Sequence, residues 1–146
     1  MPDLEMTATE SHLIISLHRI VTDLDRKTRG LCQKHGLTFG QFMVLEALYH
    51  KGPLSIGEVK ESILSTDGTI PVIVANMEKA GLLARRHDEK DRRKSILSLT
   101  EKGRDLIREV YPENAKMIHK AFSVWNDREK GNLTRLLASY WGQKNF

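Results

Sequence analysis

The chain has 146 residues, of which 40% are hydrophobic and 29% are charged, and its 23 Lys and Arg outnumber its 19 Asp and Glu by four. This length and composition predict one globular domain with a core of its own, because the chain is short for two domains. No apolar run approaches the roughly 20 residues that cross a membrane, and the acidic, polar N-terminus has no secretory-signal pattern. A single cysteine, Cys32, excludes an intramolecular disulfide. Together these features predict a cytoplasmic protein.

The first expected element is a long helix from about residue 11 to residue 35. Its apolar stripe is wide, which suggests that it contacts more than one neighbour. The stripe contains Leu13, Ile14, Leu17, Ile20, Val21, Leu24, Thr28, Leu31 and Cys32. Gly36 is expected to end the helix in the left-handed conformation, and Leu37 to fold back over the last turn.

A second helix is expected after Thr38, because Thr38 and Gln41 have the spacing of a capping box. It should stop at Gly52-Pro53. Residues 54–55 then leave room for one short strand that pairs with a later hairpin. The apolar positions of this helix are Phe42, Leu45, Leu48 and Tyr49.

Residues 55–81 have the pattern of two helices joined by a tight turn. Ser55 and Glu58 form a second capping box, and turn formers occupy residues 65–68. The second helix of the pair should start between Thr66 and Thr69, because Pro71 is tolerated only near a helix start, where its missing N–H has no partner anyway. Gly81 should end it. The two apolar stripes are Ile56, Val59 and Ile63, and Ile70, Ile73, Val74 and Met77.

The outward face of the second of these helices consists of small or short side chains. They are Gly68, Thr69, Pro71, Val72, Ala75 and Asn76. A DNA major groove admits one helix, and a helix that lies against DNA is expected to have such a face. An ordinary surface helix with short side chains has the same pattern, so the helix alone does not decide between the two interpretations.

A β-hairpin is expected next, with strands at Leu82–His87 and Ser95–Leu99. From Lys79 to Lys94 the chain has seven basic and three acidic side chains, a surplus of four that equals the surplus of the whole chain. Such a patch attracts DNA phosphates whatever the base sequence, and an arginine at the tip can enter a minor groove. A solvated charged loop is the alternative, but the neighbouring helix pair favours DNA binding.

The chain after the hairpin predicts further apolar helices. Thr100 should cap a long helix, which Pro112 is expected to kink or divide. Asn126, with Glu129 three residues later, should cap the last one. The apolar faces are formed by Met117, Ile118, Ala121, Phe122 and Trp125, and by Leu133, Leu136, Leu137, Tyr140 and Trp141. Two-fold association is the simplest way to bury these faces, and a monomeric lobe that folds back on the core is the alternative.

These elements together resemble the MarR (multiple antibiotic resistance regulator) family of bacterial transcription regulators. The matching segments are LTFGQFMVLEALYHKGPLSIGEV, STDGTIPVIVANMEKAGLLARR, DEKDRRK and LSLTEKGRDLI, and with the flanking helices the resemblance covers residues 10 to 142. It implies a mainly α-helical fold with a small β-wing, in one domain that spans residues 1–146. Residues 38–99 would form a winged helix-turn-helix core, and residues 11–35 and 100–142 a dimerisation region. The implied partners are a second copy of the chain and double-stranded DNA with a near-palindromic operator.

The resemblance assigns DNA contacts to a recognition helix at Asp67–Ala80 and a wing at Arg86–Ser95. The family's wing aspartate maps to Asp91, which is expected to pair with Arg85 or Arg86. The minor-groove arginine maps to Arg93, and its neighbour Arg92 is expected at a phosphate. The expected contact residues are Ser65, Thr66, Asp67, Gly68, Thr69, Pro71, Val72 and Asn76 in the helix, and Arg85, Arg86, Asp91, Arg92, Arg93 and Lys94 in the wing.

Family members often release DNA when a small phenolic or other aromatic compound binds between the dimerisation helices and the winged core. The candidate effector residues here are His18, Met43, Tyr111 and Trp125, and plain core packing is the alternative for all four. Cys32 is expected to be a packed core thiol and not a redox sensor, because it lies near the C-terminal end of its helix, where the dipole disfavours a thiolate.

The sequence indicates no catalytic chemistry. It has no glycine-rich phosphate loop and no nucleophile elbow, so we expect no enzyme activity. No cofactor or metal site is expected from the six histidines, although a site assembled from distant residues stays open, since some family members bind zinc. The resulting hypothesis is a ligand-responsive, homodimeric repressor that binds DNA sequence-specifically. The alternative is a winged-helix protein-interaction module without specific DNA binding.

Overall fold

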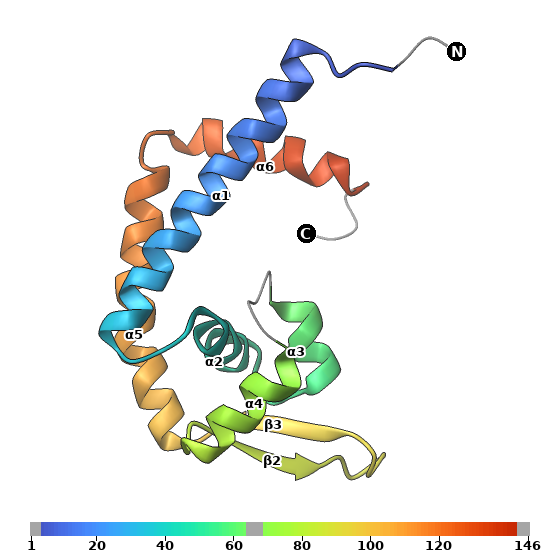
Figure 1. Ribbon diagram of the computed structural model, residues 1–146, viewed down its shortest axis with the longest axis vertical. Helices are drawn as coiled ribbons and strands as arrows, with labels where there is room; N and C mark the ends of the chain where they lie inside the picture. Colours follow the sequence, from blue (N-terminus) through green and yellow to red (C-terminus); the bar gives the residue numbers. More distant parts are fainter. Residues whose placement is uncertain (1–3, 64–68, 143–146) are drawn as a thin grey trace. The chain divides into compact units, whose positions relative to one another are not determined.

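The computed structural model of the protein describes residues 4–63 and 69–142 and is mainly helical, with one small antiparallel sheet (Figure 1). The elements are, in chain order, α1 (Ala8–Lys34), α2 (Phe39–Lys51), β1 (Leu54–Ser55), α3 (Ile56–Ser62), α4 (Ile70–Lys79), β2 (Leu83–His87), β3 (Ser95–Leu99), α5 (Glu101–Phe122) and α6 (Asp127–Tyr140). The expected fold, a helical winged helix-turn-helix, is therefore confirmed. None of the described helices has the length and apolarity needed to cross a membrane.

The chain consists of two compact units, and the boundary between them lies after Asn114. The core of the first unit is built around α2, whose Phe42, Val44 and Leu45 are almost completely buried. The apolar stripes predicted for α3 and α4 pack into the same cluster, with Val59, Val74 and Met77 fully buried. Further core members are Cys32, Leu37, Ala47, Leu48, Leu54, Ile70, Leu82, Leu83, Leu97, Ile107 and Val110. This burial fixes which faces of α3 and α4 remain outside.

Local capping sets most helix starts. Thr38 with Gln41, Ser55 with Glu58, and Asn126 with Glu129 form the reciprocal bonds of a capping box, as predicted. A fourth capping box was not predicted. In it the Thr7 N–H donates to the Glu10 carboxylate at 2.9 Å, and the Glu10 N–H donates to the Thr7 hydroxyl at 3.1 Å. The first helix therefore begins at Ala8, three residues before the expected start.

The helix ends follow the glycines. Gly36 has a positive φ of 71°, and the N–H groups of Gly36 and Leu37 donate to the carbonyls of Gln33 and Cys32. This pattern is a Schellman motif, and it folds the buried Leu37 back over the last turn of α1, as expected. The end of α4 repeats the motif, with Gly81 at φ 74° and a 2.9 Å bond from the Leu82 N–H to the Met77 carbonyl.

The sheet has the order β1-β3-β2 and is antiparallel throughout. Leu54 pairs with the buried Leu97, which confirms the short strand expected before α3. The hairpin pairs Leu83 with Leu99 and His87 with Ser95, so its loop consists of residues 88–94. Figure 1 shows β2 and β3 projecting beside α4 as one ribbon.

Pro112 was expected to kink or divide this helix, and the division is wrong, because α5 continues through Pro112. A proline removes one hydrogen bond, here to the carbonyl of Arg108, and both residues lie on the exposed side, where solvent reaches the freed oxygen. In the first unit, α5 also bonds to α1 through the buried pair Thr28 and Asn114, at 2.8 Å between hydroxyl and amide oxygens.

The second unit, Ala115–Phe146, contains the end of α5 and all of α6. The rings of Phe122 and Trp125 stack with centroids 5.8 Å apart at the turn between these helices. The apolar side chains of Leu136, Leu137 and Tyr140 on α6, and of Trp141 at its C-cap, are exposed in the single chain.

Candidate nucleic-acid interface

The expected recognition helix is α4, and its start explains the early proline. Thr69 is the N-cap residue, with extended backbone and no side-chain cap bond, and Pro71 is the second residue of the helix. The amide that proline lacks would have no partner in the first turn of a helix, so Pro71 costs the helix no hydrogen bond. The expected contacts Ser65, Thr66, Asp67 and Gly68 lie outside the described residues.

The two faces of α4 differ as predicted. Ile70, Val74 and Met77 face the core, while Thr69, Pro71 and Asn76 are exposed. Val72 is 59% exposed, although it is a large aliphatic side chain. A short, partly apolar face that the fold leaves outside can approach base edges and thymine methyl groups.

The wing tip is closed by bonds within its own loop. The Asp88 N–H donates to the Lys94 carbonyl, and the Lys94 N–H to the Asp91 carbonyl, both at 3.0 Å. The Asp88 side chain accepts the Lys90 N–H at 3.0 Å. Nδ1 of His87 lies 3.0 Å from the carbonyl oxygen of Arg92, a contact that was not predicted from the sequence. The position of His87 at the end of a strand next to a charged loop was the only signal for this contact.

Asp91 pairs with Arg93, and the expected pairing with Arg85 or Arg86 is wrong. One carboxylate oxygen of Asp91 accepts the Arg93 backbone N–H at 3.1 Å and its side-chain Nε at 3.2 Å. These two bonds hold the pKa of the Asp91 carboxyl below its usual value. The register explains the correction, because Arg85 and Arg86 sit within the ladder, opposite Leu97 and Ile96, and not at the loop.

The wing arginines have separate positions. Arg85 lies 3.8 Å from the carboxylate of Glu78 on α4, an ion pair that the sequence analysis missed. The side chain of Arg93 is 92% exposed even though its Nε contacts Asp91. Arg86, Arg92 and Lys94 are also exposed. The tip therefore presents a cation whose direction is set by a neighbouring carboxylate.

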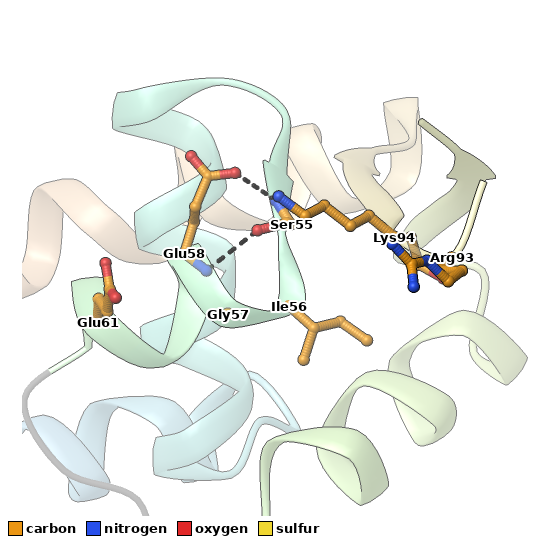
Figure 2. A pocket seen from close by; sticks show the side chains of 8 residues that line it. Ser55, Ile56, Gly57, Glu58, Glu61, Arg93 and Lys94 are labelled. Atoms are coloured by element: carbon orange, nitrogen blue, oxygen red, sulfur yellow. Dashed lines mark hydrogen bonds between the residues drawn. The ribbon is translucent and has the colours of Figure 1, made fainter. Parts of the chain in front are cut away.

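A hollow of about 420 Å³ lies between the start of α3 and the base of the wing. Figure 2 shows Ser55, Glu58 and Glu61 on one side of it and Arg93 and Lys94 on the other. The Ser55 N–H donates to the Glu58 carboxylate at 3.0 Å, and this bond, together with the nearby Ser55 side chain, lowers the pKa of that carboxyl. The Ser55 hydroxyl accepts the Glu58 backbone N–H at 3.2 Å. The hollow is thus lined by charges of both signs, with the carboxylates on α3 and the cations on the wing.

Comparison with known proteins identifies the arrangement. A model described as MarR family matches residues 35–94. The HTH-type transcriptional regulator MhqR of Bacillus subtilis (strain 168) is 33% identical over 132 residues, which cover 90% of this chain and 91% of that protein.

The chain belongs to the MarR family. The fold agrees with solved structures of the family. Sco3205 from Streptomyces coelicolor, a MarR family regulator in complex with DNA, has a TM-score of 0.83 at 20% identity and covers 94% of this chain and 89% of its own. Bordetella bronchiseptica BpsR, a protein whose DNA binding is regulated by 6-hydroxynicotinic acid, has a TM-score of 0.76 at 27% identity, and the match covers 94% of this chain and 96% of BpsR. Membership supports a DNA-binding transcriptional regulator and not the interaction module without DNA binding.

The four candidate effector residues of this MarR-family chain are not equivalent. Met43 and Tyr111 are half-buried against the core of the first unit. His18 is exposed on α1, so the structure does not bring it into that core. Trp125 belongs to the second unit, where it stacks on Phe122.

Tyr111 has two ring neighbours on α2 that the sequence analysis did not propose as effector residues. The centroids of Tyr111 and His50 are 4.7 Å apart, and those of Tyr111 and Tyr49 are 6.3 Å apart. One turn earlier, burial raises the pKa of the Glu46 carboxyl, which the charge of His50 partly offsets. The helical spacing of Tyr49 was visible in the sequence, but its contact with α5 was not.

Cys32 is completely buried, which confirms the expected core thiol. Burial raises the pKa of this thiol to about 11 from an ordinary value of 9.0. Among the described residues, no three His, Cys, Asp or Glu side chains lie close enough to hold a metal ion together.

Iodoacetamide should alkylate Cys32 at least about a hundredfold more slowly in the folded protein than in the urea-unfolded chain at neutral pH. The reason is that a pKa of about 11 instead of 9.0 leaves about a hundredth of the thiolate, which is the reactive form. The rate in the folded protein should still be rising with pH above the ordinary thiol pKa. Mass spectrometry of quenched time points measures both rates, and equal rates in the two states would contradict the prediction.

Proposed function

We propose that the protein is a homodimeric repressor that binds a near-palindromic operator sequence-specifically and is released by a small aromatic effector. The observation that supports it best is the exposed short face of α4 beside a closed basic wing tip, in a member of the MarR family. Thr69, Pro71, Val72 and Asn76 read the major groove in this proposal. A cytoplasmic location follows from DNA as the target.

The wing residues have distinct proposed roles. Arg93 enters the minor groove, and Asp91 orients it, because the carboxylate contacts both its backbone N–H and its Nε. Arg92 contacts a backbone phosphate, and Arg85, Arg86 and Lys94 add attraction to the DNA backbone.

A second copy of the chain is the proposed cover for the exposed apolar helices. On α1, Leu13, Ile14 and Leu17 are all more than 40% exposed. Leu136 and Tyr140 on α6, and Trp141 at its C-cap, are exposed as well. Monomeric soluble proteins rarely leave such patches uncovered, and two-fold dimers are the commonest oligomers. We therefore propose one MarR-type domain for residues 1–146, with a winged core at 38–99 and a dimerisation region at 11–35 and 100–142.

A small aromatic or phenolic acid is the proposed effector. Support comes from the ring cluster of Tyr49, His50 and Tyr111 at the edge of the core, next to the half-buried Met43. The ligand named for BpsR is of the same chemical class. His50 is exposed and the two tyrosines are half-buried, so their rings offer stacking surface to such a compound.

Arg93→Ala should weaken binding to an operator duplex, selected from a random pool, by about 1–3 kcal/mol, because a minor-groove contact is lost. Arg92→Ala should instead reduce the slope of log affinity against log salt by about 1. Electrophoretic mobility shifts over a salt series measure both effects, with the exposed Arg108→Ala on α5 as the matched control. Wild-type affinity of Arg93→Ala would refute the minor-groove role.

Leu17→Glu should convert the protein to a monomer at micromolar concentration, because it places a charge in the apolar face of α1. Thr22→Glu, an exposed polar position on another side of the same helix, should remain a dimer. Sedimentation velocity distinguishes the two states. A dimeric Leu17→Glu or a monomeric wild type would argue against the proposed interface.

An aromatic acid such as 6-hydroxynicotinic acid or 4-hydroxyphenylacetate should weaken operator binding of the wild type. Tyr111→Leu should reduce that effect and leave affinity without the acid unchanged, whereas Tyr111→Phe should retain it, because the ring persists. Fluorescence anisotropy of a labelled operator measures the response. If Tyr111→Leu responds like the wild type, the effector does not act through this cluster.

A further inference from the structure

Residues 100–103, Thr-Glu-Lys-Gly, lie against the end of α4 and bond to three consecutive carbonyls there. The Lys102 ammonium donates to the Ala80 carbonyl at 2.7 Å. The Thr100 hydroxyl donates to the Gly81 carbonyl at 2.6 Å, and the Thr100 N–H donates to the Leu82 carbonyl at 3.2 Å. We call this set of contacts the α4–α5 clasp.

The clasp also begins α5. The Thr100 hydroxyl, which donates to Gly81, accepts the N–H of Gly103 at 3.1 Å. Gly103 is buried, and a Cβ atom there would overlap the carbonyl oxygen of Leu82 and come within 2.9 Å of its carbonyl carbon. Because both clashing atoms are backbone, they cannot move without shifting the chain that follows α4. The first turn of α5 and the exit from α4 therefore share one closely packed junction.

Satisfying hydrogen bonds does not by itself explain the clasp. Ala80 and Gly81 are exposed, so water can reach their carbonyls without help from α5. At its other end, α4 has no side-chain cap bond at Thr69. The main effect of the bonds from residues 100–103 is consequently to hold the end of α4 and the start of α5 in one relative orientation.

We propose that Thr100, Lys102 and Gly103 are positioning residues that set the direction in which α4 presents its exposed face to DNA, and thereby its sequence specificity. This inference rests on the proposed function, since it assumes that α4 reads bases. Phosphate contacts from the wing depend less on this direction, because they accept any base sequence. The clasp therefore affects the ratio of the affinities for operator and non-operator DNA, and not the general affinity for DNA.

The test compares two duplexes, one selected from a random pool with the wild-type protein and one of equal length with scrambled sequence. Thr100→Val keeps the shape of the side chain, removes both hydroxyl bonds and changes no charge. It should lower affinity for the selected duplex by about tenfold, within the range known for coupling residues, and leave affinity for the scrambled duplex unchanged. Thr100→Ser, which keeps the hydroxyl, should restore the wild-type ratio.

A second pair guards against a folding defect in Thr100→Val. Lys102 is exposed, so Lys102→Met should fold, and it should lower the affinity ratio of the two duplexes while Lys102→Arg preserves it. Urea unfolding of each variant corrects the affinities for the folded fraction. An unchanged ratio in Thr100→Val and Lys102→Met, or an equal loss on both duplexes, overturns the clasp. A wild type that prefers neither duplex overturns the proposed function itself, and the inference with it.

Discussion

The burial of one stripe of α4 is the constraint on which the rest of the site depends. Ile70, Val74 and Met77 are held in a core formed around α2, and each such side chain stabilises the fold by about 1.5–3 kcal/mol. With that stripe inside, the opposite side of the helix has to be outside, whatever residues it carries. The hairpin follows directly from the end of α4, so its place beside the helix is a result of the same packing. The surface proposed to face DNA is thus specified by residues on the opposite, buried side of the helix.

Much of this architecture was predictable from short stretches of sequence, because its signals are local. Three capping boxes, the glycine stop after α4 and the helix start near Thr69 each depend on residues within one or two turns. The hairpin strands could be placed from apolar residues on either side of a charged loop. The basic excess of the chain falls within residues 79–94, and this charge pattern alone predicted where the proposed DNA-facing surface lies.

Contacts between distant residues were not predictable in this way. The partner of Asp91 depends on the strand register and on a rotamer, and the analogy with the family indicated the wrong arginines. The contact of Tyr111 with Tyr49 and His50 depends on where α5 packs against α2, and helical periodicity does not reveal that position. The Thr-Glu-Lys-Gly segment could be recognised as a family motif and as a helix cap. Its bonds to the carbonyls of α4 emerged only from tertiary structure.

The self-contained bonding of the wing tip has an evolutionary consequence. The described hydrogen bonds that close residues 87–94 join members of the loop to one another or to His87 at the end of β2, through Asp88, Asp91 and the backbone of Arg92 and Lys94. Exchanging the outward side chains at positions 89, 90 and 92 leaves those bonds in place. The conformation of the loop is therefore independent of the side chains at these three positions, so evolution can change the charge of the tip without refolding it, while Asp91 keeps its contact with Arg93.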